Sequence, residues 1–265
     1  MHPMLTIATR AARAAGDIIL RNIDKLDRLT IEVKADNDFV TKVDRKAEEV
    51  ILNTLQQAYP THGIIAEESG TYNEDSEYQW IIDPLDGTTN FLHGFPQYAV
   101  SIGLQHKGRM EVGVIFDPIK NELFTAARGD GAQLNGRRIR VTPRKSLAHS
   151  LIGTGFPFKQ PQYLDTYLAS FKAVHPKVAG IRRAGSAALD LAYVAAGRLD
   201  GFWEIGLNNW DMAAGVLLVR EAGGIVTDFS GEGNYLETGN VVAAASKVYP
   251  ELYETIKPHL IDELK

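Results

Sequence analysis

The sequence predicts a mixed fold, with an α+β first half followed by an α/β second half. Between residues 64 and 124, short β-like segments follow one another and are separated by turn signals. From about Ser150 onward, strand-like and helix-like segments alternate instead, which is typical of α/β proteins. We therefore place one predicted domain at residues 1–145 and a second at residues 146–265, with no flexible linker between them.

In the first half, two predicted helices precede the β-like segments. Residues 4–23 carry apolar side chains at helical spacing, and residues 41–59 repeat that pattern before Pro60 ends it. The predicted strands are residues 64–68, 79–83, 99–105, 111–117 and 122–126.

In the second half, predicted strands and helices alternate along the chain. We predict strands at residues 151–156, 180–183, 201–205 and 224–229, and helices at residues 163–174, 187–196 and 211–222. Gly197 and Gly223 stand where helices commonly end in a left-handed residue.

The composition excludes several classes of site. The chain has 265 residues, a net charge of −5 and no cysteine, which excludes disulfides, thiolate zinc sites and cysteine nucleophiles. The net negative charge argues against a large basic surface for binding nucleic acid. Two local basic clusters are interpreted as solvated surface or a subunit interface, namely Arg137, Arg138, Arg140, Arg144 and Lys145, and Arg182 and Arg183. No signal peptide or membrane-spanning run is found, so we expect a cytoplasmic protein without a membrane partner.

Several carboxylates are placed as ligands for a hard cation such as magnesium. Glu67 follows one apolar strand, and Asp83 and Asp86 follow another. Asp211 opens a predicted helix, and Asp44 lies in the first turn of another. Because strand ends converge on one edge of a sheet, these groups are expected to meet. Magnesium takes a few carboxylates, with water and substrate phosphate completing its coordination.

The residues after Asp86 add a place for an anion. Gly87 lets the backbone approach a ligand closely, and the hydroxyl of Thr88 can bind a phosphate oxygen or orient a water. Both lie at a predicted helix start, where free N–H groups favour phosphate. This combination suits in-line attack of a metal-activated water on phosphorus.

Each acidic residue also has an ordinary structural interpretation. Asp44 with Thr41 matches a capping box, and Asp211 matches an N-cap. Asp83-Pro84 is a common turn initiator, and Glu67-Glu68 fits a solvated strand end. Together, these interpretations do not explain why acidic residues end two apolar strands, one of them followed by Gly-Thr-Thr.

Other chemistries lack their motifs in this sequence. Neither the P-loop pattern nor the Gly-x-Gly-x-x-Gly dinucleotide pattern is present. The seven histidines form no His-x-x-x-His pair for zinc, and no Gly-x-Ser-x-Gly elbow indicates a serine hydrolase. An aspartyl-phosphate route is disfavoured because the two motif aspartates are three residues apart.

These residues resemble the signatures of the inositol monophosphatase family. The matching motifs are DPLDGTTNF at residues 83–91 and WDMAAG at residues 210–215, with the acidic segment 67–69 upstream. Residues 1–5, 153–158 and 182–204 resemble the bacterial housekeeping branch of the family, and the likeness covers nearly the whole chain. It implies an αβαβα layered sandwich that is usually dimeric and is inhibited by lithium.

The resemblance also implies a role for each site residue. The implied magnesium ligands are Glu67, Asp83, the carbonyl of Leu85, Asp86 and Asp211. The implied catalytic residues are Glu67, Thr88 and Asp44, the last two orienting the attacking water. The implied substrate contacts are Asp86, Gly87, Thr88, Gly185, Ser186, Ala187, Glu204 and Asp211. Lys34 and Asp38 match a loop that approaches a third metal in this family.

The expected function is magnesium-dependent hydrolysis of myo-inositol monophosphate. Glu204 favours a polyol leaving group, since a carboxylate accepts hydroxyl hydrogen bonds and would repel a second phosphate. Phosphatases for related sugar, nucleotide or histidinol phosphates are the neighbouring alternatives. A different alternative is a scaffold or accessory factor in a transcription antitermination complex with RNA polymerase, because the bacterial branch has such members. Arg182 and Arg183 are candidates for a dimer or partner contact.

Overall fold

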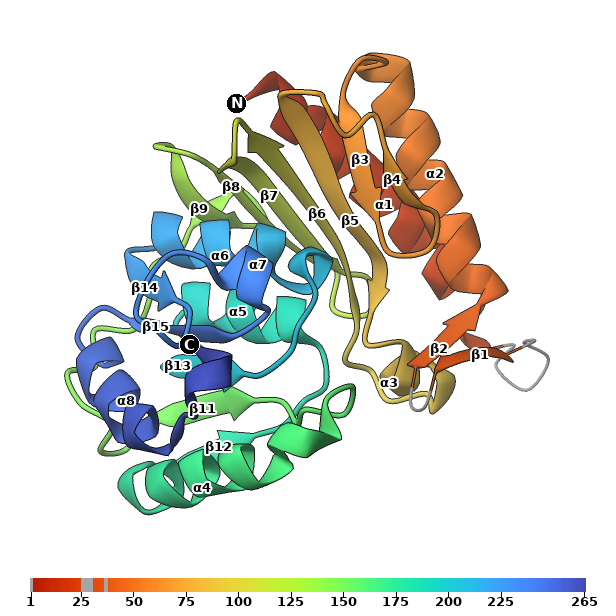
Figure 1. The fold of residues 1–265 in the computed structure, drawn as a ribbon. Coiled ribbons are helices and arrows are strands. Elements are labelled where there is room, and N and C mark those ends of the chain that lie inside the picture. Colours follow the sequence, from red (N-terminus) through yellow and green to blue (C-terminus); the bar gives the residue numbers. More distant parts are fainter. Residues whose placement is uncertain (1, 25–30, 36–37) are drawn as a thin grey trace.

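The structure is a computed structural model that describes residues 2–24, 31–35 and 38–265. It has two main sheets and three layers of helices, which stack as α, β, α, β, α (Figure 1). The predicted αβαβα layered sandwich is therefore confirmed. Among the described residues, no helix combines the length and apolar character that crossing a membrane requires.

The large sheet is built entirely from the first half of the chain. Its order is β10-β9-β8-β7-β6-β5-β3-β4, and every neighbouring pair is antiparallel except β3 and β5. Its strands are β3 (Gly63–Ala66), β4 (Gly70–Tyr72), β5 (Tyr78–Asp86), β6 (Ala99–His106), β7 (Arg109–Asp117), β8 (Glu122–Ala127), β9 (Gly131–Leu134) and β10 (Arg137–Arg138). A separate hairpin pairs β1 (Ile31–Ala35) with β2 (Asp38–Thr41).

The small sheet is built from the second half, in the order β12-β11-β13-β15-β14. Its strands are β11 (Leu151–Thr154), β12 (Gly180–Arg182), β13 (Gly201–Glu204), β14 (Gly224–Thr227) and β15 (Val241–Ala245). The central strand β13 is parallel to β11 and antiparallel to β15.

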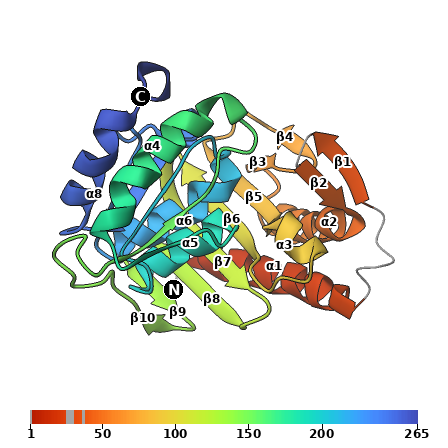
Figure 2. The same ribbon diagram turned by 90° about the horizontal axis from the view of Figure 1, so that it is seen from below.

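The helices cover both faces of each sheet. They are α1 (Pro3–Leu20), α2 (Lys42–Ala58), α3 (Thr88–Leu92), α4 (Leu164–Val174), α5 (Ala187–Ala195), α6 (Asn209–Glu221), α7 (Tyr235–Thr238) and α8 (Tyr249–Ile256). Helices α1 and α2 lie on one face of the large sheet, and α5 and α6 lie between the sheets (Figure 2). Helices α4 and α8 cover the far face of the small sheet. Apolar clusters fill these interfaces.

Helix α6 packs unusually close to the large sheet, which matters because it carries Asp211. A Cβ placed on Gly113 of β7 would lie 2.7 Å from the carbonyl oxygen of Ala214. A Cβ on Gly103 of β6 would lie 3.0 Å from the Cβ of Ala213. Only glycine permits this close approach, so these two positions bring the first half of α6 against the middle of β6 and β7.

Several details differ from the sequence-based expectations, including strands β1, β2, β4, β9 and β10 and helix α7, which local patterns did not predict. Strand β5 continues through the motif to Asp86, with a register irregularity between Asp83 and Asp86, because Pro84 cannot donate to the ladder and a bulge absorbs the extra residues. Helix α6 begins at Asn209 rather than Asp211. Strand β15 and helix α8 were not predicted, since a run such as VVAAA fits a buried helix or a buried strand equally well.

Candidate functional site

Three carboxylates from two elements converge at the ends of the large-sheet strands. Asp83 and Asp86 belong to β5 and Asp211 to α6, and one oxygen of each lies within 4.8 Å of the others. The bulge in β5 allows both aspartates to turn to the same place. Glu67 follows β3, the parallel neighbour of β5, and its amide donates to the Ile82 carbonyl over 3.2 Å. The predicted convergence of these residues is therefore present in the structure.

The electrostatics of this group are those of a cation site. Burial, followed by the charges of Glu67, Asp86 and Asp211, holds the pKa of Asp83 well above its usual range. Burial raises the pKa of Asp86 to about 6, and burial with the charge of Asp86 raises that of Asp211 to about 7. Carboxylates this close disfavour one another's ionisation, so a bound cation would stabilise their charged forms. The acidic group could thus hold a metal.

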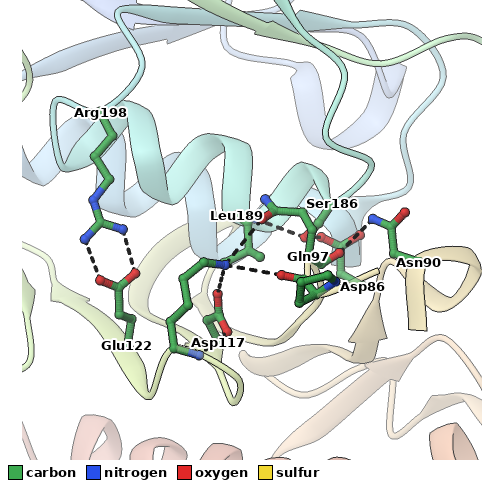
Figure 3. Close-up of polar contacts among 10 residues, drawn as sticks. Asp86, Asn90, Gln97, Asp117, Glu122, Ser186, Leu189 and Arg198 are labelled. Atoms are coloured by element: carbon green, nitrogen blue, oxygen red, sulfur yellow. Dashed lines mark hydrogen bonds and ion pairs between the residues drawn. The ribbon is translucent and has the colours of Figure 1, made fainter. Parts of the chain in front are cut away.

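Hydrogen bonds orient each of the three carboxylates. Asp83 accepts from the amide of Leu85 over 2.9 Å, which closes a local turn. Asp211 accepts from the amide of Asn208 over 2.7 Å, so it is the third residue of a capping box rather than the N-cap. Asp86 accepts from the hydroxyl of Ser186 and from the amide of Ala188. Figure 3 shows Asp86 and Ser186 meeting across the two halves of the chain.

Two oxygen atoms hold the hydroxyl of Thr88. Its hydroxyl lies 3.0 Å from the carboxylate of Asp44 and 3.0 Å from the carbonyl oxygen of Leu85. Asp44 is fully buried and does not line the cavity, because it also accepts from Thr41 in a capping box at the start of α2. The capping interpretation of Asp44 is confirmed, and the same carboxylate also contacts the candidate catalytic hydroxyl.

A cavity of about 280 Å³ joins the acidic group to residues of the second half. Apart from Asp44, every residue predicted for the site lines it: Glu67, Asp83, Leu85, Asp86, Gly87, Thr88, Gly185, Ser186, Ala187, Glu204 and Asp211. Ser186 caps α5, as predicted, with its hydroxyl accepting from the amide of Leu189. The side chains of Lys34 and Asp38 lie outside the described residues.

The far end of the cavity is formed around Glu204, at the end of β13. Its carboxylate lies directly over Gly155, where an added Cβ would come within 1.9 Å of Oε1. Burial, followed by the charge of Asp190, holds the pKa of Glu204 well above its usual range, and the charge of Arg183 opposes that rise. Glu204 therefore lines the cavity with the guanidinium of Arg183, and the charges of Asp190, Asp211 and Asp86 all act on its carboxyl group.

Several cavity residues were not predicted from the sequence. Arg183 was considered only as a partner contact, yet it lines the cavity with its guanidinium 4.8 Å from the ring centre of Phe158. Asp190 does not line the cavity but raises the pKa of Glu204 through its charge. It is 2% exposed, and its Oδ1 has no hydrogen-bond partner within the described part of the chain. Asn90 lies within the DGTTN motif and also lines the cavity, so its place in that motif was the one signal that could have revealed it.

Known proteins of similar sequence and structure identify the family of this chain. The family model described as the inositol monophosphatase family matches residues 1–261. The chain is 56% identical over 270 residues to Nus factor SuhB of Pseudomonas aeruginosa, covering 100% of both chains. The crystal structure of the extragenic suppressor protein suhB from Bartonella henselae superposes with a TM-score of 0.94, at 46% identity, over 98% of this chain and 100% of that one.

A third relative carries the family name itself. The inositol monophosphatase from Anabaena superposes with a TM-score of 0.87, at 42% identity, over 96% of this chain and 95% of that one. The family model spans nearly the whole sequence, and the acidic group, the fold and these relatives agree with it. The chain therefore belongs to the inositol monophosphatase family.

Proposed function

We propose that this protein hydrolyses an inositol monophosphate to inositol and phosphate, with magnesium as its cofactor. The observation that carries the proposal is the convergence of Asp83, Asp86 and Asp211 at one end of a cavity. Their raised pKa values reflect burial and mutual repulsion, which a divalent cation with oxygen ligands would offset. Membership of the family supports the same activity.

Magnesium would be held by oxygen atoms of two halves of the chain. The proposed ligands are Glu67, Asp83, the carbonyl of Leu85, Asp86 and Asp211, all of which line the cavity. All are hard oxygen donors, which magnesium prefers. Bound there, magnesium would supply positive charge to the phosphate oxygens and lower the pKa of the attacking water.

Other residues would place the water and the phosphate. The hydroxyl of Thr88, oriented by the buried Asp44, would hold the attacking water beside the acidic group. Gly87 has a φ of 94° and carries no side chain, so its amide and that of Thr88 would reach the phosphate without obstruction. Glu67 would act together with these groups on the water.

The second half would receive the leaving group. Gly185, Ser186 and Ala187 line the cavity beside Asp86, and Glu204 lies beyond them. A carboxyl group there accepts hydroxyl hydrogen bonds, whereas a second phosphate would add negative charge beside acid groups whose charges already disfavour the ionisation of Glu204. We therefore place the inositol ring between Glu204 and the loop at residues 185–187, in preference to a sugar bisphosphate, nucleotide or histidinol phosphate.

The test is phosphate release from inositol 1-phosphate, measured with and without magnesium and with added lithium. We expect turnover that requires magnesium and is inhibited by lithium. A panel containing fructose 1,6-bisphosphate, a nucleoside 3′-phosphate and histidinol phosphate accompanies it. Strong preference for any of these over inositol 1-phosphate would overturn the substrate assignment, and turnover without any divalent metal would overturn the cofactor assignment.

A second candidate function comes from the relatives named Nus factor SuhB, such as that of Pseudomonas aeruginosa. We propose that the chain also acts as an accessory factor in a transcription antitermination complex with RNA polymerase, as a homodimer in the cytoplasm. Arg182 is exposed at the end of β12 and is available for a dimer or partner contact.

A pull-down tests the second function separately from catalysis. Tagged protein is mixed with purified RNA polymerase and elongation factors, and the experiment is repeated with Asp83→Asn. We expect retention of the partners by both proteins, since the acidic group faces a cavity rather than a partner. If neither protein retained RNA polymerase or the elongation factors, the result would count against the proposal. The mass measured by sedimentation tests whether the protein is a homodimer.

A further inference from the structure

Asn90 joins the two halves of the chain at a single side-chain nitrogen. Its Nδ2 donates to the carbonyl oxygens of Gln97 over 2.7 Å, Ala184 over 2.9 Å and Gly185 over 3.1 Å. An amide nitrogen has two hydrogens, so one of them is shared between two acceptors. Figure 3 shows Asn90 beside Gln97 and close to Asp86 and Ser186. The side chain therefore links the phosphate-side motif to the leaving-group loop.

The backbones of the two halves approach so closely here that a donor is required. A Cβ on Gly87 would lie 2.9 Å from the carbonyl oxygen of Gln97 and 3.2 Å from that of Gly185. Gly87 and Gly185 both have positive φ, at 94° and 87°. Carbonyl oxygens that converge in a partly buried place are stabilised by a hydrogen-bond donor between them, and Asn90 supplies that donor.

The large-sheet side of this link is rigidly supported. Lys120 Nζ lies 3.4 Å from the side-chain oxygen of Gln97 and 3.4 Å from the carbonyl oxygen of Pro96. The same Nζ donates over 2.7 Å to Asp117, which is fully buried at the end of β7. Lys120 thus connects the segment at residues 96–97 to the end of β7, and Asn90 connects the backbone of Gln97 to the loop at residues 183–187.

A second link between the same segments is made by a carboxylate instead of an amide. Asp86 accepts from Ser186 and Ala188, but Asp86 is also one of the three clustered carboxylates. Asn90 is uncharged and lies outside that group. The Asn90 link can therefore hold the leaving-group loop whatever the charge of the acidic group.

We propose that Asn90 is a positioning residue that sets the distance between the phosphate-side motif and the leaving-group loop. Through that distance it selects for leaving groups that fill the space up to Glu204. The selectivity part rests on the proposed phosphatase function, whereas the positioning part does not.

The test uses two variants of Asn90. Asn90→Asp keeps the shape of the side chain but places an oxygen, instead of the donating nitrogen, against three carbonyl oxygens. Asn90→Ala removes the donating amide group without adding a charge. Asn53→Asp, on the exposed face of α2, is the matched control. We expect kcat/KM for inositol 1-phosphate to fall about tenfold or more. The fall in kcat/KM for p-nitrophenyl phosphate, whose leaving group is not a polyol, should be at least about fivefold smaller. The half-saturating magnesium concentration should not change.

Hydrogen exchange measures the positioning without any turnover. In metal-free protein, Asn90→Asp should speed exchange of the amides at residues 185–190 about tenfold, while those of β6 and β7 stay protected. Faster exchange across the whole chain, or equal losses on both substrates with unchanged exchange, would overturn the proposal. An inactive wild type would count against the phosphatase function alone, because the exchange result still decides the role of Asn90.

Discussion

The two ends of the cavity bury acid groups in different ways. At the proposed phosphate end, one carboxylate oxygen each of Asp83, Asp86 and Asp211 lies within 4.8 Å of the others. At the leaving-group end, Glu204 has Asp190 as an acidic neighbour, and the nearby guanidinium of Arg183 offsets part of their charge. Concentrated negative charge suits a divalent cation. A moderated charge suits an uncharged polyol, which offers only hydroxyl groups.

The two ends also differ in how the chain builds them. Most of the phosphate end comes from one short segment, the β5–α3 motif, with Glu67 and Asp211 added from the side. The leaving-group end comes from residues after β11, before and within α5, and at the end of β13. We therefore expect changes at the first end to remove activity altogether, and changes at the second end to alter the choice of substrate.

The largest effect is expected from Asp83→Asn. Loss of one carboxylate from the proposed metal ligands should lower turnover by more than the roughly 100-fold typical of residues that merely support a ligand. The fold should remain, because the amide has nearly the shape of the carboxyl group. It also removes one of several buried acid groups that disfavour one another's ionisation in the metal-free protein. Steady-state kinetics and thermal unfolding measure both, with the exposed Asp130→Asn as the control. Near-normal activity at low magnesium would contradict the ligand assignment.

A smaller and more selective effect is expected from Gly155→Ala. The new methyl group would lie 1.9 Å from Oε1 of Glu204 and must displace that carboxylate. Since the obstructed atom ends a side chain, the fold should survive. We expect KM for inositol 1-phosphate to rise about tenfold, with little change in the magnesium requirement.

Gly233→Ala is the matched control for that variant, because an added Cβ there meets no atom within 4 Å. If Gly155→Ala weakened magnesium dependence as strongly as it weakened substrate binding, the two ends would not be separable. Magnesium binding and substrate binding would then depend on the same groups.

Ser186→Ala measures how strongly the ends are coupled. Ser186 donates to Asp86 and also caps α5. Loss of the cap should lower the free energy of unfolding by about 1 kcal/mol, and loss of support for Asp86 should raise the half-saturating magnesium concentration by up to about tenfold. Chemical denaturation and magnesium titrations are the measurements. An unchanged magnesium requirement would show that Asp86 is oriented without this contact.

The smallest effect is a pH dependence of metal-free stability. Burial raises the pKa of Asp86 to about 6 and of Asp211 to about 7, from 3.8 when unfolded. The folded state therefore binds these protons more tightly, and their contribution to stability is complete below about pH 4 and lost as pH rises through 6 to 7. We expect the metal-free melting temperature to fall by a few degrees across this range.

Added magnesium should reverse this trend, because its ligands must be deprotonated and its affinity rises with pH. Thermal unfolding in chelator and in magnesium, from pH 5 to 8, makes the comparison. Asp83→Asn, which removes one of the repelling charges, should show a flatter profile without metal. A metal-free melting temperature that rises steadily from pH 5 to 8 in wild type but not in this variant would contradict the assignment.

Local sequence determined much of this protein. Apolar spacing predicted α1, α2 and the main strands, and the DPLDGTTNF segment indicated the phosphate end because its carboxylates, glycine and hydroxyls are neighbours along the chain. The division at residues 145 and 146 stays a prediction. Asp44 showed a capping signal in its spacing from Thr41, and the structure confirms the cap.

Only the tertiary structure decided which distant groups meet. Arg183 and Asp190 gave no local signal for a site, and the motif around Asn90 did not indicate its bond to Ala184, 94 residues away. Asp190 is likewise influenced by Asp86 of the distant motif. Glycines at positions 113 and 103 allow α6 to approach the large sheet and carry Asp211 to Asp83. Spacing along a chain encodes contacts within one element, whereas contacts between elements follow from how closely their backbones can pack.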